Sequence, residues 1–193
     1  MDAISRLLQP RSVAVIGASG DPAKTAGRPV SYLLKHGFTG KVYPVNPKLD
    51  RIGDLPCYRD VASLPEVPDV GIVLLGAERA HLAVRDLAAR GAAAAIVLAS
   101  GYTETGEEGA RRQQQLVEAA GGMRILGPNT IGLVNLTDDI VLSASGAVGI
   151  ATAESSTLHS RGLEGCILNA VQSWTFPAPR EGAGSALYQF VLH

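Results

Sequence analysis

The sequence predicts an α/β fold in which a doubly wound parallel sheet of five or more strands is covered by helices. Five short apolar runs recur at near-regular intervals without strict apolar–polar alternation, as expected of strands buried on both faces. Helical patterns separate these runs, which is typical of βαβ units with right-handed crossovers and of a Rossmann-like sheet. The expected strands are SVAVIGA from Ser12, KVYPVNP from Lys41, VGIVLL from Val70, AAIVLAS from Ala94 and MRILGPN from Met123.

Three helices are expected between these strands, and each has a glycine at its end. The first is PVSYLLKHG, ending at Gly37. The second spans residues 77–91, with an apolar side that we assign to Leu82, Val84 and Leu87. The third is GEEGARRQQQLVEAAGG, whose early glutamates suit the positive end of a helix. The stretch between Pro47 and Pro68 is looser, and we expect a short hairpin or helix there.

Composition excludes several classes of function. The formal net charge is −1, which disfavours a nucleic-acid or membrane-surface role. No apolar run approaches the roughly 18–20 residues that span a bilayer, and the N-terminus lacks the features of a secretory signal. The two cysteines form neither a metal pattern nor a disulfide framework, so we expect a reduced, cytoplasmic protein without a metal. The positive charge is concentrated early, since all four lysines lie within the first 48 residues.

The loop after the first strand is a candidate anion-binding site. Gly17, Ala18, Ser19 and Gly20 are small enough for backbone N–H groups to face an anion, next to the positive end of the following helix. Ser19 and Lys24 add further donors. The loop lacks the G-x-G-x-x-G spacing of nicotinamide enzymes, and the alternative is a plain turn that needs glycine for its dihedral angles.

The end of the second strand narrows the choice of ligand. Folds that bind NAD place an acidic residue near this point, where it accepts a hydrogen bond from the ribose. This chain has Asn46, Pro47 and Lys48 instead, which favour a phosphorylated ribose. The ligands that fit are NADP and coenzyme A, and the alternative is a surface turn closed by Asn-Pro.

Several motifs occur together in an order typical of one family. They are SVAVIGAS, a spaced Lys24, GFTGKVYPVNPK, IVLASGYTETGEEG and LGPNTIGLVN. The chain resembles the CoA-binding domain of NDP-forming acyl-CoA synthetases, which are related to the succinyl-CoA ligase α chain. The resemblance covers about residues 8–145, which we expect to form one Rossmann-like domain. Residues 146–193 are expected to be an irregular C-terminal tail or the truncated start of a further domain.

The resemblance implies a set of coenzyme A contacts. The nucleotide contacts it implies are Gly17, Ala18, Ser19, Lys24, Asn46, Pro47 and Lys48. Ser100, Gly101 and Asn129 are implied to lie nearer the pantetheine arm and its reacting end. Departures from the family pattern are mild here: Gly76 stands where proline is more common, and Thr130 replaces a common cysteine.

The resemblance also implies an enzyme that is larger than this chain. A full synthetase makes acyl-CoA from an acid, CoA and a nucleoside triphosphate through a phosphohistidine, and it uses an ATP-grasp domain or subunit. We expect no catalytic residue in this chain, because His36 and His81 fall on helices, His159 and His193 lie in the unmatched tail, and no GK[ST] loop is present. A homo-oligomer is compatible with the sequence. The alternative function is an NADP-dependent oxidoreductase, although its candidate donors Tyr102 and Lys24 form no recognisable catalytic pair.

Overall fold

The computed structural model describes residues 2–135 and 140–142, so the tail expected over residues 146–193 lies outside the described residues. The chain divides into two units, Met1–Ala144 and Ser145–His193, and every described residue belongs to the first. The predicted α/β class is confirmed within this unit. No helix in the described part of the chain is long and apolar enough to cross a membrane.

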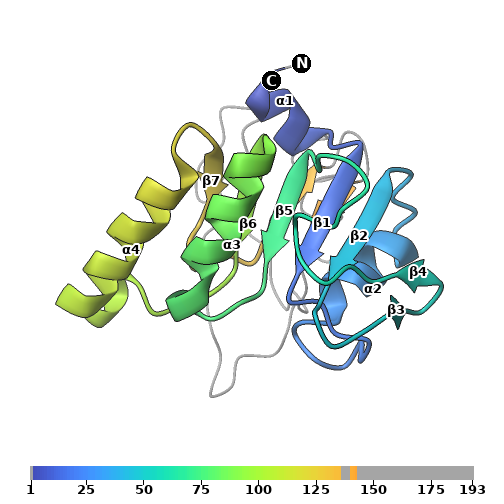
Figure 1. Cartoon of the computed structure of the whole chain (residues 1–193), viewed down its shortest axis with the longest axis horizontal. Coiled ribbons are helices and arrows are strands. Elements are labelled where there is room, and N and C mark those ends of the chain that lie inside the picture. The colour runs from blue at the N-terminus through green and yellow to red at the C-terminus, as the bar shows by residue number, and fades with distance from the viewer. Residues whose placement is uncertain (1, 136–139, 143–193) are drawn as a thin grey trace, which may run out of the picture. The chain divides into compact units, whose positions relative to one another are not determined.

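Five parallel strands form the central sheet in the order β2-β1-β5-β6-β7 (Figure 1). Their registers are continuous: Val13 lies opposite Val42 on one side and Val70 on the other. All five apolar runs predicted as strands are strands here. Their bounds are β1 Ser12–Ile16, β2 Lys41–Val45, β5 Val70–Val73, β6 Ala94–Val97 and β7 Arg124–Leu126.

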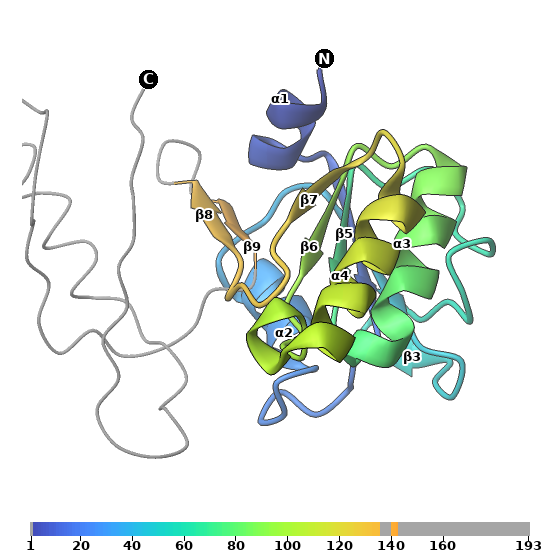
Figure 2. The same cartoon turned by 90° about the vertical axis from the view of Figure 1, so that its left-hand side faces the viewer.

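Helices cover both faces of the sheet. One face carries α2 (Arg28–Lys35), and the other carries α3 (Ala77–Arg90) and α4 (Glu107–Ala120) (Figure 2). All three helices were predicted, and α3 ends at Gly91, whose φ of 89° is a left-handed conformation that glycine adopts readily. A short hairpin of β8 (Leu133–Asn135) and β9 (Ile140–Leu142) lies on the α2 face.

Alternate strand residues build two separate cores. Val13 and Val15 face the cluster that contains Leu33 of α2, whereas Ala14 and Ile16 face the cluster that contains residues of α3. The β5 residue Gly71 lets α3 approach closely, because a Cβ there would lie 2.2 Å from Leu87 Cδ1. Burial on both faces explains why the strands read as continuous apolar runs in the sequence.

Four details differ from the sequence prediction or complete it. A short N-terminal helix, α1 (Ala3–Leu8), and the β8–β9 hairpin were not predicted. The loose stretch after Pro47 forms the hairpin alternative, with β3 (Arg51–Ile52) paired to β4 (Leu55–Pro56). The assignment of Leu82 to the apolar core side of its helix was wrong, since Leu82 is 40% exposed while Val84 and Leu87 are buried.

The amino edge of the sheet is held together by one buried carboxylate. Asp69 precedes β5 and accepts hydrogen bonds from Arg6 Nε at 2.6 Å and from the Arg11 backbone N–H at 2.8 Å. Burial alone would raise the pKa of Asp69, but these bonds from Arg11 and Arg6 outweigh it and hold the pKa below its usual value. The ion pair between Arg6 of α1 and Asp69 holds α1 at the edge where the strands begin (Figure 1).

The opposite, carboxyl edge contains the topological switch point. Adjacent strands β1 and β5 lead to helices on opposite faces, because β1 continues to α2 and β5 continues to α3. In open α/β sheets a ligand binds in the crevice outside the strand ends at such a point. The fold therefore predicts a binding site beyond Ile16 and Val73.

Candidate functional site

A pocket of about 490 Å³ opens at this switch point. Its floor is apolar and includes Ile16 at the end of β1, Val45 at the end of β2, and Leu74 and Leu75 after β5. One face of α3 forms a wall, and Leu82 lines it, which explains the partial exposure of this leucine. An apolar floor with polar groups at its rim is the usual composition of a site for a nucleotide.

The turn after β1 places Gly17 in the pocket lining. Gly17 has a φ of +83°, and a Cβ there would lie 3.0 Å from Leu75 Cδ2, so the turn requires glycine. Its N–H and that of Ala18 donate to the Val45 carbonyl at 2.9 and 3.3 Å, and the Ser19 N–H donates to the Ala26 carbonyl at 3.0 Å. These N–H groups are therefore engaged within the protein, and the sequence-based expectation that they face an anion does not describe this conformation.

The rest of the first loop folds on itself. Lys24 Nζ lies 3.8 Å from Asp21 Oδ2, and the Ser19 hydroxyl oxygen accepts a hydrogen bond from the Asp21 N–H. Neither Ser19 nor Lys24 lines the pocket. The first turn of α2 offers fewer donors than predicted, because the Arg28 N–H donates to the Lys24 carbonyl and Pro29 has no N–H.

Asn46 joins the first two loops of the site. Its side-chain Nδ2 donates to the Ala18 carbonyl at 2.8 Å, and its Oδ1 accepts from the Lys48 N–H at 2.9 Å. The second bond is a local turn that asparagine often makes, and the first crosses between the loops. Asn46 therefore acts here as a positioning residue for Lys48. Asn46, Pro47 and Lys48 all line the pocket, so the structure brings together three of the residues predicted to contact a ligand.

Two arginines also line the pocket, and the sequence analysis did not predict them. Arg59 follows Tyr58, which bridges in parallel to Val45, so Arg59 lies beside the end of β2. Arg79 lies in the first turn of α3. Neither belongs to a motif, and only the spacing of Arg79, Leu82 and Asp86 on one helix face could have indicated a common surface.

Ser100, Gly101 and Asn129 lie farther along the same edge and do not line this pocket. They follow β6 and β7, and they are neighbours because the Asn129 N–H donates to the Ala99 carbonyl at 2.9 Å. The Gly101 N–H donates to Glu104 Oε1 at 2.7 Å. Hydrogen bonds from backbone N–H groups, that of Gly101 first, hold the pKa of the Glu104 carboxyl below its usual value.

Tyr102 does not reach the pocket. Its side chain is fully buried in the core beneath α3 and α4, and its hydroxyl has no hydrogen-bond partner within the described residues. Burial raises the pKa of the hydroxyl, and Glu78 and Glu104 raise it further. A proton donor of an oxidoreductase must touch its substrate, so this position argues against the oxidoreductase alternative.

Neither described histidine lies at the site. His81 is on α3 and His36 follows the end of α2, and both are absent from the pocket lining. His159 and His193 lie outside the described residues. The described residues also contain no group of three or more His, Cys, Asp or Glu side chains that could hold a metal ion.

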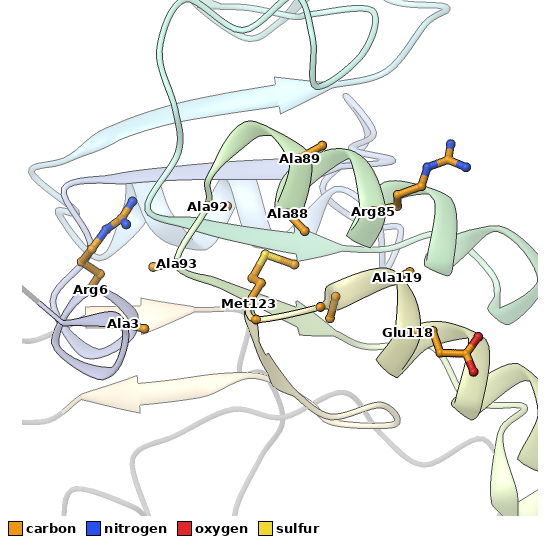
Figure 3. Close-up of a pocket in the computed structure, with 13 residues that line it drawn as sticks. Ala3, Arg6, Arg85, Ala88, Ala89, Ala92, Ala93, Glu118, Ala119 and Met123 are labelled. Atoms are coloured by element: carbon orange, nitrogen blue, oxygen red, sulfur yellow. The ribbon is translucent and has the colours of Figure 1, made fainter.

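A second hollow, of about 630 Å³, lies at the amino edge of the sheet between α1, α3 and α4 (Figure 3). Alanines such as Ala88 and Ala119 form most of its surface, together with Met123. Its arginines Arg6 and Arg85 are paired with carboxylates. It contains none of the residues predicted to bind a ligand, so its greater volume does not make it the better candidate.

The fold is of the doubly wound α/β class, and its pocket lies at the switch point where such folds bind ligands. Comparison with known proteins is more specific: residues 11–135 match the model described as the CoA binding domain, and the chain belongs to that family. The residues at the end of the second strand fitted either NADP or coenzyme A. Membership of this family supports coenzyme A as the ligand.

Similar proteins include a CoA ligase and an acyl-CoA synthase. The chain is 38% identical over 139 residues to an ADP-forming acetate–CoA ligase II of Archaeoglobus fulgidus, covering 71% of this chain and 21% of that one. It is 37% identical over 180 residues to a trans-feruloyl-CoA synthase from an unknown prokaryote, covering 83% of this chain and 26% of that one. The chain thus spans about a quarter or less of these curated relatives.

A solved structure resembles this chain over the same region. It is the apo form of dinucleotide forming acetyl-coenzyme A synthetase 1 from Ca. Korarchaeum cryptofilum, with a TM-score of 0.68 and 34% identity. The match covers 75% of this chain and 33% of that one. The likeness supports the Rossmann-like architecture.

Proposed function

We propose that this chain supplies the coenzyme A-binding part of an NDP-forming acyl-CoA synthetase, and that the pocket beyond β1, β2 and β5 receives the nucleotide end of CoA. The observation that carries the proposal is the position of Lys48. A cation stands at the end of the second strand, where NAD-binding folds place an acid, in a chain that belongs to the CoA-binding family.

The lining suggests how the parts of the ligand are arranged. The apolar floor of Ile16, Val45 and Leu74 suits the adenine ring, and Lys48 at the rim suits a phosphate. The pantetheine arm then extends along the carboxyl edge toward Ser100, Gly101 and Asn129, in the order of the strands β5, β6 and β7. The domain would bind and orient the thiol without changing it chemically.

The complete reaction needs parts that we assign to other domains. An acid, CoA and a nucleoside triphosphate give an acyl-CoA, a nucleoside diphosphate and phosphate, and the phosphoryl group requires a carrier nucleophile beside the nucleotide. Neither described histidine lines the pocket. We propose that an ATP-grasp domain or subunit and a phosphohistidine domain complete the enzyme. The relatives act on acids as different as acetate and trans-ferulate, which suggests that this part does not select the acid.

Calorimetry with the full chain tests the proposal. CoA is expected to bind, and dephospho-CoA is expected to bind about tenfold or more weakly, because a charge-assisted contact contributes roughly 1.5–3 kcal/mol. NADP carries a ribose phosphate and a pyrophosphate but no pantetheine, and we expect it to bind more weakly than CoA. Tight binding of NADP without binding of CoA would favour the oxidoreductase alternative.

Incubation with γ-phosphate-labelled ATP tests whether this chain alone accepts a phosphoryl group or forms acyl-CoA. We expect no acyl-CoA from acetate and no labelled protein, since the domains that handle the triphosphate are assigned elsewhere. An acid-labile, base-stable phosphoprotein whose label maps to His159 would contradict this division of labour.

A further inference from the structure

Unpaired cations converge on the candidate site. Among the described residues, most lysine and arginine side chains have an ion-pair or hydrogen-bond partner, such as Glu66 for Lys41 and the Leu64 carbonyl for Arg90. Five have none in that part of the chain. Three of the five line the pocket at the switch point, and they are Lys48, Arg59 and Arg79. Lys35 and Arg124 lie elsewhere.

The acids that line the pocket are already engaged. Asp60 Oδ1 accepts the Ser63 N–H at 2.7 Å, and Asp86 Oδ1 lies 3.4 Å from an Arg85 nitrogen. Neither forms an ion pair with a cation of the pocket. Like charges gathered around one cavity repel each other, and a bound anion removes that repulsion.

The backbone places two of the cations at one rim. The Tyr58 N–H donates to the Pro44 carbonyl, and the Asn46 N–H donates to the Tyr58 carbonyl at 2.8 Å. This pairing fixes the segment that carries Arg59 against the end of β2, next to the turn that presents Lys48. Arg79 comes instead from the first turn of α3, directly after the β5 end.

We propose that Arg59 and Arg79 are phosphate-binding residues of this pocket. With Lys48, Arg59 contacts the ribose phosphate at the β2 end, while Arg79 contacts the pyrophosphate at the β5 end. A guanidinium group offers two parallel donors to one phosphate, which suits it to this role. The inference rests on the proposed function, because it names the groups that recognise the phosphates of CoA.

The test uses Arg59→Gln, Arg79→Gln and the control Arg124→Gln, each in the full chain, with CoA and dephospho-CoA as probes. Arg124 is matched because it is exposed and unpaired within the described residues but lies at the start of β7, outside the pocket. R59Q is expected to weaken CoA about tenfold and to leave dephospho-CoA unchanged. R79Q is expected to weaken both ligands about tenfold, and R124Q neither.

The outcomes separate this inference from the proposed function. If the wild type binds CoA and both pocket variants bind it equally well, the inference is overturned and the proposed function stands. If the wild type does not bind CoA, both fail. If R59Q weakens CoA and dephospho-CoA equally, Arg59 does not read the ribose phosphate. Melting temperatures are expected to be unchanged, because both arginines are exposed, and Arg59→Lys should restore part of the lost affinity.

Discussion

The two edges of the sheet use their cations differently. At the amino edge, Arg6 and Arg11 converge on the buried carboxylate of Asp69. At the carboxyl edge, Lys48, Arg59 and Arg79 surround a pocket without partners among the described residues. A cation that has a buried partner stabilises the fold, whereas cations left unpaired around a cavity indicate a ligand of opposite charge.

The largest expected effect is the loss of the amino-edge pair. Asp69→Ala should lower the free energy of unfolding by about 2–3 kcal/mol, because it removes a charged acceptor from both arginines and from a backbone N–H. Urea denaturation measures this, with Asp86→Ala as an exposed control. The folded fraction of Asp69→Ala should bind coenzyme A with the wild-type affinity, because Asp69 lies at the opposite edge of the sheet from the pocket. An unchanged urea midpoint for D69A would contradict the role given to this edge.

The same carboxylate should make stability depend on pH. The folded-state pKa of Asp69 is lowered, so its contribution is present above the unfolded-state pKa of about 3.9 and is lost as the pH falls through the folded value. The stability difference between wild type and Asp69→Asn should therefore be large at neutral pH and vanish in acid. If the stability difference persists below both pKa values, the packing and hydrogen bonding of the side chain at position 69 explain it, rather than its charge.

A smaller effect is expected at the carboxyl edge, where Gly17 shapes the turn. Gly17→Ala should cost roughly 1–2 kcal/mol of stability because of its positive φ, and it should weaken CoA binding by displacing Leu75. Gly20→Ala is a matched control, since a Cβ there meets no atom within 4 Å and its φ is not positive. Equal stability and CoA affinity in the two variants would show that the turn is not under this constraint.

Asn46 should give the smallest change in stability. Asn46→Ala removes two side-chain hydrogen bonds and should cost about 1 kcal/mol, with weaker CoA binding because the turn that presents Lys48 is loosened. Asn46→Asp keeps the acceptor for the Lys48 N–H but places a carboxylate in the pocket. We expect N46D to bind CoA more weakly than N46A, and this order distinguishes repulsion of phosphate from loss of positioning. The reverse order in calorimetry would contradict that account.

Much of the fold could be predicted because the strands are buried on both faces. Runs such as SVAVI and VGIV then read as continuous apolar segments, and glycines such as Gly91 mark the helix ends. Local periodicity does not distinguish a helix face that lines a pocket from one that packs in a core, which is why Leu82 was misassigned. The three-residue strands of the β8–β9 hairpin carry too little periodicity to be recognised.

Sequence reasoning reached the pocket residues that directly follow strands and missed those that do not. Asn46, Pro47 and Lys48 stand directly after β2, so the rule for strand ends reached them. Arg59 and Arg79 are ordinary exposed cations in the sequence, and only the pairing of Tyr58 with Val45 and the packing of α3 bring them to the pocket. The N–H groups of Gly17 and Ala18 donate to the carbonyl of Val45, which is distant in sequence. The sequence alone therefore could not show that these donors are already engaged.

We propose that the carboxyl edge binds phosphate through cations that have no partner among the described residues. The most direct measurement compares Lys48→Gln with Lys35→Gln, two exposed lysines without side-chain partners in the described part of the chain, only one of which lines the pocket. Calorimetry should show that K48Q loses about tenfold in CoA affinity and removes most of the preference over dephospho-CoA, while K35Q matches the wild type. Equal affinities for CoA in K48Q, K35Q and the wild type would contradict the account.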